Sequence, residues 1–536
     1  MLPAYIKRDD IRGLYPQELN CETAEALGYA VCRLLARNCS APHIAIGYDC
    51  RHGNLEIQSG FAAGFQAAGG TCVSFGLLST EHIYYICGTR SEFTAGAMIT
   101  ASHNPKEYNG IKLLHGGCLP FTSAELVEIG EAAVAYKPQP QGKCSSCSNH
   151  SCPAKNAASN QGNLGERSVF AQDVPMQLLD FKAYANFLLH LSGLDKREES
   201  PHAQIRIVVL AGHGMGGLAF GAIAEMMRGR GLQSTLIEPE PDGDFPEGVP
   251  NPLDKKYMAR LSEMVQLHQA DLGICFDGDA DRAGFVDATG EEILPSQVLA
   301  LIAQHRLQES DIKEPVVMRN LCCSKLLEDL FPKDAPVTLI DTPVGHGRIK
   351  LLMRHPELNS RCVFAGEHSG HYFYPDFFYL DSGVLTSLFM IEIVWRLREQ
   401  RKSLPDLLSA WRQNYVWSGE INFNLKSSDE VLPVMTAVWK AENKDGVRRF
   451  EVAQDPKLGV QRVFENNGEY KPQSLPAPDL KMQYDGEEGW WFVIRPSGNE
   501  PKLRLNVEAW GSNAKALCQQ KTEELIERLL SLGAFR

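Results

Sequence analysis

The chain has 536 residues, 44% of them hydrophobic, which at about 150 residues per domain predicts three or four domains. Its 53 basic and 66 acidic residues give a net charge of −13, which argues against nucleic acid or an anionic membrane as the main partner. No apolar run approaches the ~18 residues of a membrane span, no signal sequence is recognisable and the 15 cysteines are scattered, so we expect a cytoplasmic protein acting on small molecules.

Three segments begin as apolar, β-branched strands, turn at small or polar residues and continue into helical patterns. They are residues 43–53 (HIAIGYDCRHG), 206–217 (RIVVLAGHGMGG) and 315–330 (PVVMRNLCCSKLLEDL). Because such units assemble into sheets with parallel strands, we predict an α/β fold with three similar mixed α/β domains. Their expected bounds are residues 1–185, 186–292 and 293–415.

A buried strand from Ala95 to Ile99 is expected to lead into the segment TASHNP of residues 100–105. Pro105 disfavours helix at the residue before it, so Ser102 and His103 should lie in a turn at the end of this strand. A serine hydroxyl is a poor nucleophile without a base or a metal, but as a phosphate carrier beside a cation it is chemically reasonable.

Residues 137–170 are poor in apolar side chains and rich in Ser, Asn, Gly and Pro, which predicts a mobile insert in the first domain. Zinc binding is the alternative for this segment. Four closely spaced ligands leave little chain to wrap a tetrahedral ion, so the insert is the preferred interpretation. The candidate zinc ligands are Cys144, Cys147, His150 and Cys152.

The segment GHGMGG has Gly212, Gly214 and Gly217 in the spacing of a dinucleotide-binding turn, with Glu238 about twenty residues further on. An NAD-dependent oxidoreductase is therefore an alternative class. A glycine-rich turn is also what a tightly packed parallel unit uses, and the following PDGDFPEGVPNP is an unusual continuation for a ribose-binding strand.

The segment DGDADR follows the apolar LGICF and has Asp277, Asp279 and Asp281 at alternate positions. Alternate side chains of an extended segment point the same way, so the three carboxylates converge. A hard divalent cation would relieve their repulsion, and Mg²⁺ is preferred because it keeps positions open for phosphate oxygens. An EF-hand loop is excluded because Arg282 and Ala288 stand where it needs Gly and Glu. A solvated acidic turn is the other alternative, and it would not normally follow a buried strand so closely.

The segment AGEHSGHYF has Glu367, Ser369 and His371 close together, and a carboxylate with a hydroxyl on a turn suits recognition of sugar hydroxyls. A plain polar loop is the alternative. A zinc site is disfavoured because the glutamate precedes both histidines and Gly370 weakens any helix.

Residues 416–536 alternate in the manner of strands and end in an amphipathic helix, which predicts a fourth, α+β domain with a mostly antiparallel sheet. Residues 440–478 are expected to be an added hairpin or excursion within it. The segment RPSGNEP lies between two apolar strands, where its backbone N–H groups can form an anion nest or simply close a hairpin turn.

The motifs TASHNPKEYNGIK, DGDADR, GEHSGH and RPSGNEP, in this order, resemble the α-D-phosphohexomutase superfamily, and more closely its bacterial phosphomannomutase/phosphoglucomutase branch. The resemblance implies four domains around a central cleft, one Mg²⁺ per chain and interconversion of hexose 6-phosphate and hexose 1-phosphate. The reaction would pass through a phosphoserine and a hexose 1,6-bisphosphate, which also serves as activator. Whether the chain is a monomer or a dimer stays open.

The resemblance also implies roles for individual residues. Ser102 matches the phosphoserine and, with Asp277, Asp279 and Asp281, would bind Mg²⁺. Acid/base or charge-stabilising roles fall to His103 beside the serine, Arg12, Lys112, Arg282 and His346. The sugar-recognition loop would contain Glu367, Ser369 and His371. The phosphate that is not transferred would be held by Arg495, Ser497, Gly498 and Asn499.

Two positions depart from the family pattern. Asp9 stands where the family often has Tyr before DIRG, and His368 stands where the sugar loop more often has Met or Glu. The strand RLNVE resembles that of phosphomannomutases, so mannose is the expected sugar and glucose a second one. Amino-sugar phosphates and a non-catalytic sugar-phosphate sensor are the alternatives.

Overall fold

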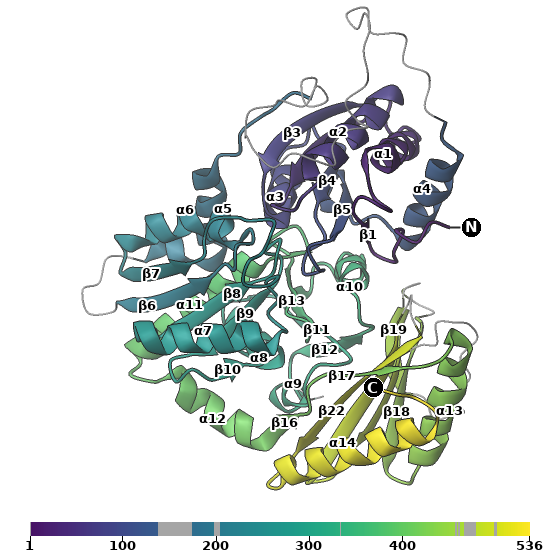
Figure 1. Ribbon diagram of the computed structural model, residues 1–536. Helices are drawn as coiled ribbons and strands as arrows, with labels where there is room; N and C mark the ends of the chain where they lie inside the picture. Colours follow the sequence, from purple (N-terminus) through teal and green to yellow (C-terminus); the bar gives the residue numbers. More distant parts are fainter. Residues whose placement is uncertain are drawn as a thin grey trace, which may run out of the picture.

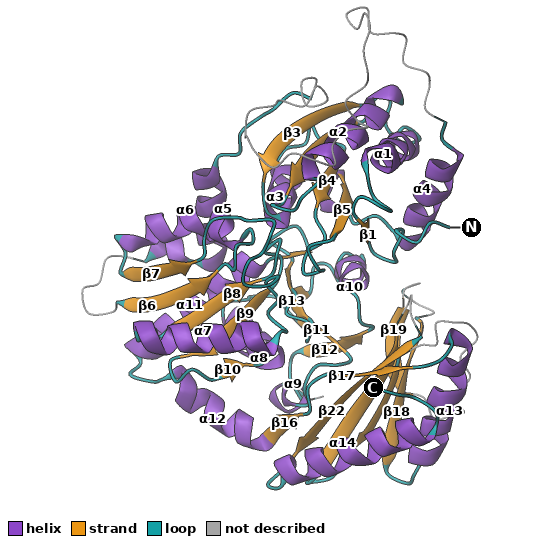
Figure 2. Cartoon of the chain, in the orientation of Figure 1, coloured by secondary structure: helices purple, strands orange, loops and turns teal. Residues whose placement is uncertain are grey.

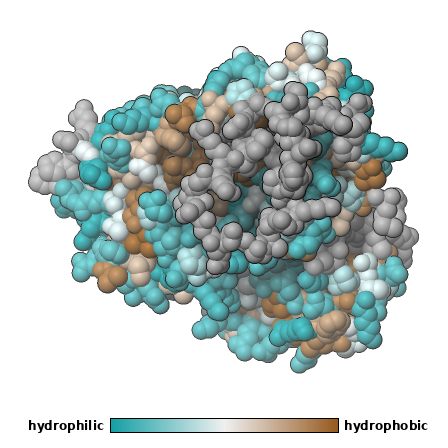
Figure 3. All heavy atoms as spheres, turned by 45° about the horizontal axis from the view of Figure 1, so that its top comes forward, coloured by the Kyte–Doolittle hydropathy of each residue, from teal (hydrophilic) through white to brown (hydrophobic). Residues whose placement is uncertain are grey.

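The computed structural model describes residues 2–137, 174–197, 204–332, 334–455, 458, 461–465, 479–497 and 501–536. The predicted insert and its four candidate zinc ligands fall outside the described residues. Among the described helices, none is long and apolar enough to cross a membrane. Among the coloured residues visible in Figure 3, most are hydrophilic, and the hydrophobic ones lie in separate patches.

The described strands form four sheets, and we number the four domains by these sheets. In the first, β2 is parallel to β3 and β4, and β5 is antiparallel to β4 and β1, in the order β1-β5-β4-β2-β3. The strands are β1 (Ile11–Leu14), β2 (His43–Tyr48), β3 (Thr71–Leu77), β4 (Ala95–Ile99) and β5 (Tyr108–His115). The helices are α1 (Cys21–Leu35), α2 (Asn54–Ala67), α3 (Thr80–Thr89) and α4 (Ser123–Ala135), with a 3₁₀ turn at Gly116–Cys118.

Alternation along β2 explains how the two faces of the first sheet are covered. Ile44 and Ile46 point into the core beneath α1, α2 and α4, whereas Ala45 points into the core that contains α3. The backbones of helices α1 and α2 approach closely at Gly28. A Cβ at this position would clash with the carbonyl of Phe61, so the contact depends on glycine. The second of these cores continues into the next two domains, so α3 lies between domains.

The second and third sheets repeat the first in outline, with orders β10-β9-β8-β6-β7 and β12-β11-β13-β14-β15. The second domain contains α5 (Phe181–Ser192), a 3₁₀ turn (Leu194–Lys196), β6 (Ile205–Leu210), α6 (Gly216–Arg228), β7 (Leu232–Ile237), α7 (Lys255–His268), β8 (Leu272–Phe276), β9 (Ala283–Asp287) and β10 (Glu292–Ile293). The third contains α8 (Pro295–Gln308), β11 (Val316–Asn320), α9 (Leu326–Leu330), β12 (Thr338–Thr342), α10 (His346–Met353), β13 (Cys362–Gly366), β14 (Tyr372–Tyr374), β15 (Leu380–Asp381), α11 (Gly383–Glu399) and α12 (Leu404–Asn414).

The fourth domain is built on one sheet whose strand pairs are all antiparallel among the described residues. It consists of β16 (Tyr415–Trp417), β17 (Ile421–Asn424), a 3₁₀ turn (Ser428–Glu430), α13 (Val431–Glu442), β18 (Val447–Gln454), β19 (Gln461–Glu465), β20 (Leu480–Tyr484), β21 (Gly489–Pro496), β22 (Lys502–Trp510) and α14 (Ala514–Ser531). Helices α13 and α14 cover one face of the sheet (Figure 1). On the other face, Trp491 and Trp510 pack against Leu321 and Cys322 of the third domain.

The fold confirms the predicted class, three mixed α/β domains followed by a domain with an antiparallel sheet. The three predicted strand–helix units are β2–α2, β6–α6 and β11–α9. The excursion expected at residues 440–478 contains the antiparallel strand pair β18–β19, although residues 456–457, 459–460 and 466–478 lie outside the described part of the chain.

Glu81 of α3 ties three domains together. This buried carboxylate accepts hydrogen bonds from Tyr184 Oη (2.8 Å) in the second domain, and from Ser382 Oγ (2.7 Å) and Val384 N (2.9 Å) at the start of α11. An acidic side chain at a helix N-terminus satisfies free N–H groups and the helix dipole. The first domain is thereby fixed to the third beside the loops described next.

Candidate active site

Three of the predicted motifs lie in loops that follow strands, and the fourth begins in the last residues of a strand. The Ser102 loop follows β4, the acidic loop follows β8, the Glu367 loop follows β13 and the Arg495 segment ends β21. In open α/β sheets, ligands bind outside the carboxyl ends of the strands. The loops of the first three domains meet at the centre of the molecule in Figure 2.

The loop that contains Ser102 is held in an uncommon conformation. Ser102 has a φ of +51°, the left-handed region that side chains other than Gly seldom adopt, and it is 3% exposed. The guanidinium of Arg51, whose side chain is fully buried, donates to four carbonyl groups of this loop. They belong to Ser102 (2.7 Å), Asn104 (2.6 Å), Pro105 (2.8 Å) and Tyr108 (3.0 Å).

Two further contacts complete this support. Thr100 Oγ1 accepts from Ser102 N at 2.9 Å and donates to Asp49 at 2.6 Å. Arg12, in β1, donates from Nη1 to Asn104 Oδ1 at 2.7 Å. Arg51, Asp49 and Thr100 were not singled out from the sequence. Because they set the position of the hydroxyl, we count them with the site.

The acidic loop lies directly against the serine. Ser102 Oγ donates to Asp277 Oδ2 at 2.7 Å, and a Cβ on Gly278 would clash with the carbonyl oxygen of Ser102. Arg282 donates from Nε to Asp277 Oδ2 at 2.9 Å and lies 3.4 Å from Ser102 Oγ. Only a glycine at position 278 allows the two loops to approach this closely.

Asp277, Asp279 and Asp281 form a group with the geometry and the donor set for a hard cation. One oxygen of each lies within 4.8 Å of the others, and all three side chains are buried. Oδ1 of Asp279 and Oδ1 of Asp281 have no hydrogen-bond partner among the residues that the structure describes. Buried carboxylate oxygens left without partners are costly, so these residues fit a divalent cation bound through oxygen.

Cationic side chains balance the outer oxygens of the group. Lys112 Nζ donates to Asp279 Oδ2 at 2.6 Å and to Asp281 Oδ2 at 2.5 Å. Burial alone would lower the pKa of Lys112, but the two carboxylates raise it above its ordinary value, so Lys112 is cationic. Burial would raise the pKa of Asp281, but Lys112 and then Arg282 lower it to about 2. For Asp277, burial raises the pKa to about 7.

Thr80, at the start of α3, is a further residue of the site that the sequence did not reveal. Its Oγ1 donates to Asp279 Oδ2 at 2.5 Å, and its backbone N donates to the carbonyl of Asp279 at 3.1 Å. Both residues are fully buried. Thr80 therefore fixes the central carboxylate of the acidic loop from the neighbouring domain.

The loop after β13 brings Glu367, Ser369 and His371 together. Ser369 Oγ donates to Glu367 Oε2 at 3.1 Å and lies 3.0 Å from His371 Nδ1. Glu367 Oε1 accepts from the backbone N of Gly345 at 2.9 Å. The ring of His346 stacks on that of His371 with centroids 5.6 Å apart. A carboxylate, a hydroxyl and two imidazoles thus line one position.

His371 connects this loop to the acidic loop. Its Nε2 lies 3.7 Å from Asp281 Oδ1 and 3.7 Å from Asp381 Oδ2. Burial, followed by the positive charge of Arg282, lowers the pKa of His371 well below its ordinary value. Lys350, which was also missed, balances the buried Asp381 at 2.6 Å. The third domain therefore reaches the acidic loop through a neutral imidazole.

The fourth domain contributes Arg495 and Ser497, at the end of β21. Arg495 is largely buried and donates to Glu420 Oε2 at 3.1 Å, and Ser497 N donates to the carbonyl of Lys502 at 2.9 Å. The segment is thus the start of the β21–β22 hairpin connection, and the two predicted interpretations of it are compatible. Gly498 and Asn499 lie outside the described residues.

The glycine turn that resembled a dinucleotide site serves packing. Met215 N donates to the carbonyl of Gly278 at 3.0 Å, and a Cβ on Gly214 would lie 3.0 Å from the same oxygen. A Cβ on Gly217 would clash with the carbonyl of Pro239. The glycines allow this turn to approach the acidic loop.

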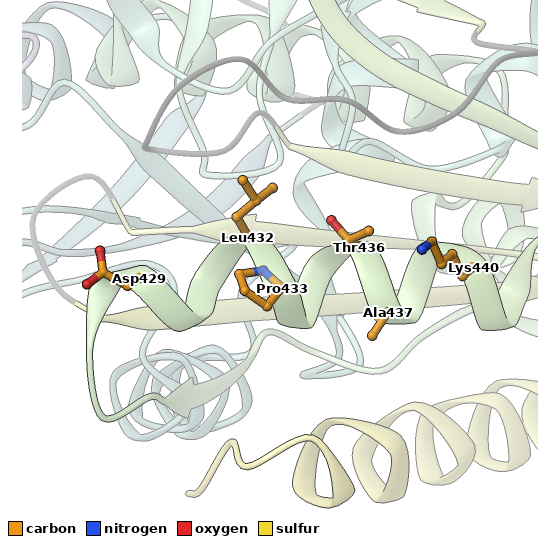
Figure 4. Close-up of a pocket in the computed structure, with 6 residues that line it drawn as sticks. All are labelled: Asp429, Leu432, Pro433, Thr436, Ala437 and Lys440. Atoms are coloured by element: carbon orange, nitrogen blue, oxygen red, sulfur yellow. The ribbon is translucent and has the colours of Figure 1, made fainter.

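A pocket of about 470 Å³ lies away from these motifs, on the fourth domain (Figure 4). Its lining comes from α13 and the turn before it, and consists of Asp429, Leu432, Pro433, Thr436, Ala437 and Lys440. None of the residues of the predicted motifs lines it, so we place no reaction there.

Comparison with known proteins gives the same four-part division. Domain families I, II and III of phosphoglucomutase/phosphomannomutase, each described as alpha/beta/alpha, match residues 4–139, 182–290 and 295–415. The C-terminal domain family of the same proteins matches residues 421–525.

Similar proteins cover almost the whole chain. A protein named "Phosphohexose mutases" from Xanthomonas campestris pv. campestris is 30% identical over 528 residues, 98% of each chain. A phosphomannomutase of Vibrio cholerae is 27% identical over 543 residues, again 98% of each. The crystal structure of a phosphoglucomutase/phosphomannomutase family protein from Burkholderia thailandensis has the same fold, with a TM-score of 0.71, 21% identity and coverage of 99% and 98%. The chain therefore belongs to the phosphoglucomutase/phosphomannomutase family of mutases.

Proposed function

We propose that this chain interconverts hexose 6-phosphate and hexose 1-phosphate, with mannose as the main sugar and glucose as a second one. The observation that carries the proposal is the hydroxyl of Ser102, held 2.7 Å from Asp277 beside two further carboxylates and two cations. Phosphoryl transfer asks for positioning and charge neutralisation, and both are built into this arrangement.

In the proposed cycle, phosphorylated Ser102 loses its phosphoryl group to the free hydroxyl of the sugar monophosphate. The bond between the serine oxygen and phosphorus breaks, a bond from the sugar oxygen to phosphorus forms, and the hydroxyl proton passes by way of an imidazole to the serine oxygen. His103 Nδ1 is 3.1 Å from Ser102 Oγ and is a candidate acceptor. The resulting 1,6-bisphosphate turns end for end, and its other phosphoryl group returns to Ser102. The bond from that phosphorus to the sugar oxygen breaks, a bond to the serine oxygen forms, and the serine proton goes back to the sugar oxygen.

The residues of the site divide this work among them. Arg282 and Lys112 would face the negative charge of the transferring group, while Arg12 and Arg51 hold the serine loop. A divalent cation bound by Ser102 and the three aspartates, for which we propose Mg²⁺, would neutralise phosphoryl charge. Sugar hydroxyls would be recognised by Glu367, Ser369 and His371, and His346, which stacks on His371, is a further candidate for acid/base or charge-stabilising work. The second phosphate would be held by Arg495, Ser497, Gly498 and Asn499.

Two features support mannose as the main sugar. The strand RLNVE, which is part of β22, resembles that of phosphomannomutases, and the Vibrio cholerae relative carries that name. Mannose and glucose differ only in the configuration at C2. The difference in binding free energy between them is therefore small, unless the wrong sugar leaves a buried polar group of the site unpaired. Some activity with glucose phosphates is therefore expected.

A coupled assay tests the proposal by following conversion of mannose 1-phosphate to mannose 6-phosphate, with Mg²⁺ and a trace of hexose 1,6-bisphosphate. Turnover is expected to need the metal and to be lost in Ser102→Ala. Ser59→Ala is the matched control, because this buried serine only donates to the carbonyl of Leu55 within α2.

Three results would contradict parts of the proposal. Activity that survives in Ser102→Ala rejects the phosphoserine, and a larger kcat/KM with glucose 1-phosphate reverses the sugar preference. Absence of turnover with both sugars directs the search to amino-sugar phosphates, and then to a sugar-phosphate sensor.

A further inference from the structure

The N-terminal segment places an arginine against the third domain. Arg8 donates from Nε (2.9 Å) and Nη2 (2.7 Å) to Asp9 Oδ2, which fixes the direction of its side chain. A Cβ on Gly345 would clash with Arg8 Nη2, and a Cβ on Gly347 would lie 3.2 Å from Asp9 Oδ1. The pair Arg8–Asp9 therefore lies against the first turn of α10, beside His346. This gives a physical role to Asp9, which departs from the family's tyrosine.

A second arginine faces the first. Arg348 belongs to that same turn of α10, and its guanidinium has no hydrogen bond or ion pair with any side chain that the structure describes. Burial lowers the pKa of Arg348, and the positive charge of Arg8 lowers it further. The effects of Asp479, Asp9 and Glu367, which raise it, are each smaller than that of Arg8. Asp479, Asp9 and Glu367 act on Arg348 electrostatically, but none of them forms an ion pair with it among the described residues.

The fourth domain completes the surroundings of these two arginines. Asp479 interacts electrostatically with Arg8, Arg348 and Arg495, and Glu367 does so with the same three. Burial raises the pKa of Asp479. Glu367 Oε1 already accepts from Gly345 N, and Arg495 is engaged with Glu420. Among the described residues, neither the Arg348 guanidinium nor Arg8 Nη1 donates a hydrogen bond, so both can donate to an added anion.

We propose that Arg8 and Arg348 form an anion subsite that binds the phosphate group not being transferred, opposite Arg495. The subsite rests on the proposed function and deepens it: this phosphate is held from three domains, and not by the Arg495 segment alone. Arginine forks match the geometry of phosphate oxygens, and an anion between two cations removes their repulsion. The Asp9 carboxylate orients Arg8 and leaves Arg348 to the ligand.

Equilibrium binding tests the subsite without requiring turnover. The full chain with Ser102→Ala is titrated calorimetrically with mannose 6-phosphate and with inorganic phosphate, alone and combined with Arg8→Gln or Arg348→Gln. A charged hydrogen bond to phosphate is worth a factor of roughly ten or more in affinity. Each arginine variant is expected to raise the Kd for mannose 6-phosphate about tenfold. In the otherwise unaltered enzyme the same variants should raise KM while kcat changes less than about threefold.

Two further variants serve as controls. Arg361→Gln makes the same change in net charge at the other end of β13, where Arg361 pairs with Glu314 on the surface. It should leave the Kd unchanged. Arg348→Lys keeps the charge without the fork, and its Kd should lie between those of the unaltered chain and Arg348→Gln.

The outcomes separate the subsite from the reaction. If both glutamine variants bind mannose 6-phosphate with unchanged Kd and only Tm falls, the arginines are a contact between domains and the subsite is rejected. The subsite is also rejected if neither probe binds when both arginines are present. If no hexose phosphate is turned over, yet binding still weakens tenfold in both variants, the reaction is rejected and the subsite stands.

Discussion

The two ends of the candidate site differ in how completely their side chains are partnered. At the serine end, Ser102 and the three aspartates are at most 3% exposed, and each makes hydrogen bonds to a residue of another loop or domain. At the arginine end, the side chain of Arg8 is 49% exposed and Arg348 has no partner among the described side chains. The serine end, which we call the prebuilt end, has its side chains fixed by the protein alone. The arginine end still has donors free for a ligand.

This difference follows from what the proposed reaction asks of each end. Transfer of a phosphoryl group needs charges and donors that are fixed before the reaction, because reorganising them would add to the barrier. The far end must grip either phosphate of a bisphosphate and release it so that the intermediate can turn. Arg348, which has no ion-pair partner among the described residues, can bind and release a phosphate without breaking an ion pair of its own.

The largest effect is expected from Arg51→Lys, which would break the prebuilt end. Lysine keeps the charge but cannot donate to four carbonyls at once, so the Ser102 loop should relax from its left-handed conformation. A displacement of about 1 Å at a reacting group costs roughly a hundredfold in rate. We expect kcat to fall about a hundredfold in the coupled assay, with KM little changed.

Arg354→Lys is the control for this prediction. Arg354 also donates to carbonyl groups, those of Cys118, Phe378, Tyr379 and Lys350, but none of them belongs to the serine loop. Its substitution should lower Tm without a comparable loss of kcat. Equal losses of kcat in the two variants would mean that Arg51 acts through general stability.

A smaller effect is expected from Thr80→Val, which removes one hydrogen bond to the acidic loop. Groups that orient a metal ligand typically contribute ten- to a hundredfold to metal affinity. The Kd for Mg²⁺, measured by the metal dependence of turnover and by direct titration, should rise about tenfold. Thr386→Val is the control, because Thr386 is equally buried and bonded but lies in α11. A metal Kd that is the same in both variants would remove Thr80 from the site.

Local patterns in the sequence were sufficient to predict the class of fold and to place the motifs after strands. A few neighbouring residues carry each of these patterns. One is the alternation of three aspartates after an apolar strand, Asp277, Asp279 and Asp281, and another is an apolar strand followed by a helical pattern. The contacts that fix these motifs are not local. Arg51 reaches a carbonyl 51 positions further on, and Thr80 reaches a carboxylate 199 positions away.

Glycine was the residue type whose meaning depended most on the structure. Gly212, Gly214 and Gly217 have the spacing of a dinucleotide turn, but two of them make room for the backbone of Gly278 and Pro239. A close approach and a ligand site need the same missing side chain, so spacing alone does not separate them. Gly278 shows the same ambiguity, because nothing in DGDADR indicates that the carbonyl of Ser102 lies against it.

The smallest predicted effect concerns the pH dependence of the helix that supports the prebuilt end. His82 of α3 is fully buried between Phe181 and Tyr184, and burial lowers its pKa from 6.5 to about 3. The folded chain therefore keeps His82 neutral while the unfolded chain takes up a proton below pH 6.5, so its contribution to stability is complete above pH 6.5 and is lost as the pH falls toward 3.

Between pH 8 and pH 6 this group alone should reduce the free energy of unfolding by about 0.8 kcal/mol. His82→Gln keeps an acceptor for the backbone N of Ser79 and removes the titration, so denaturant unfolding should show a shallower loss of stability over this range. His268→Gln, at an exposed position at the end of α7, is the control, and its free energy of unfolding should fall between pH 8 and pH 6 as much as that of the unaltered chain. An identical pH dependence in the unaltered chain and in His82→Gln would show that folding does not lower the pKa of His82, and that burial in α3 does not keep this imidazole neutral.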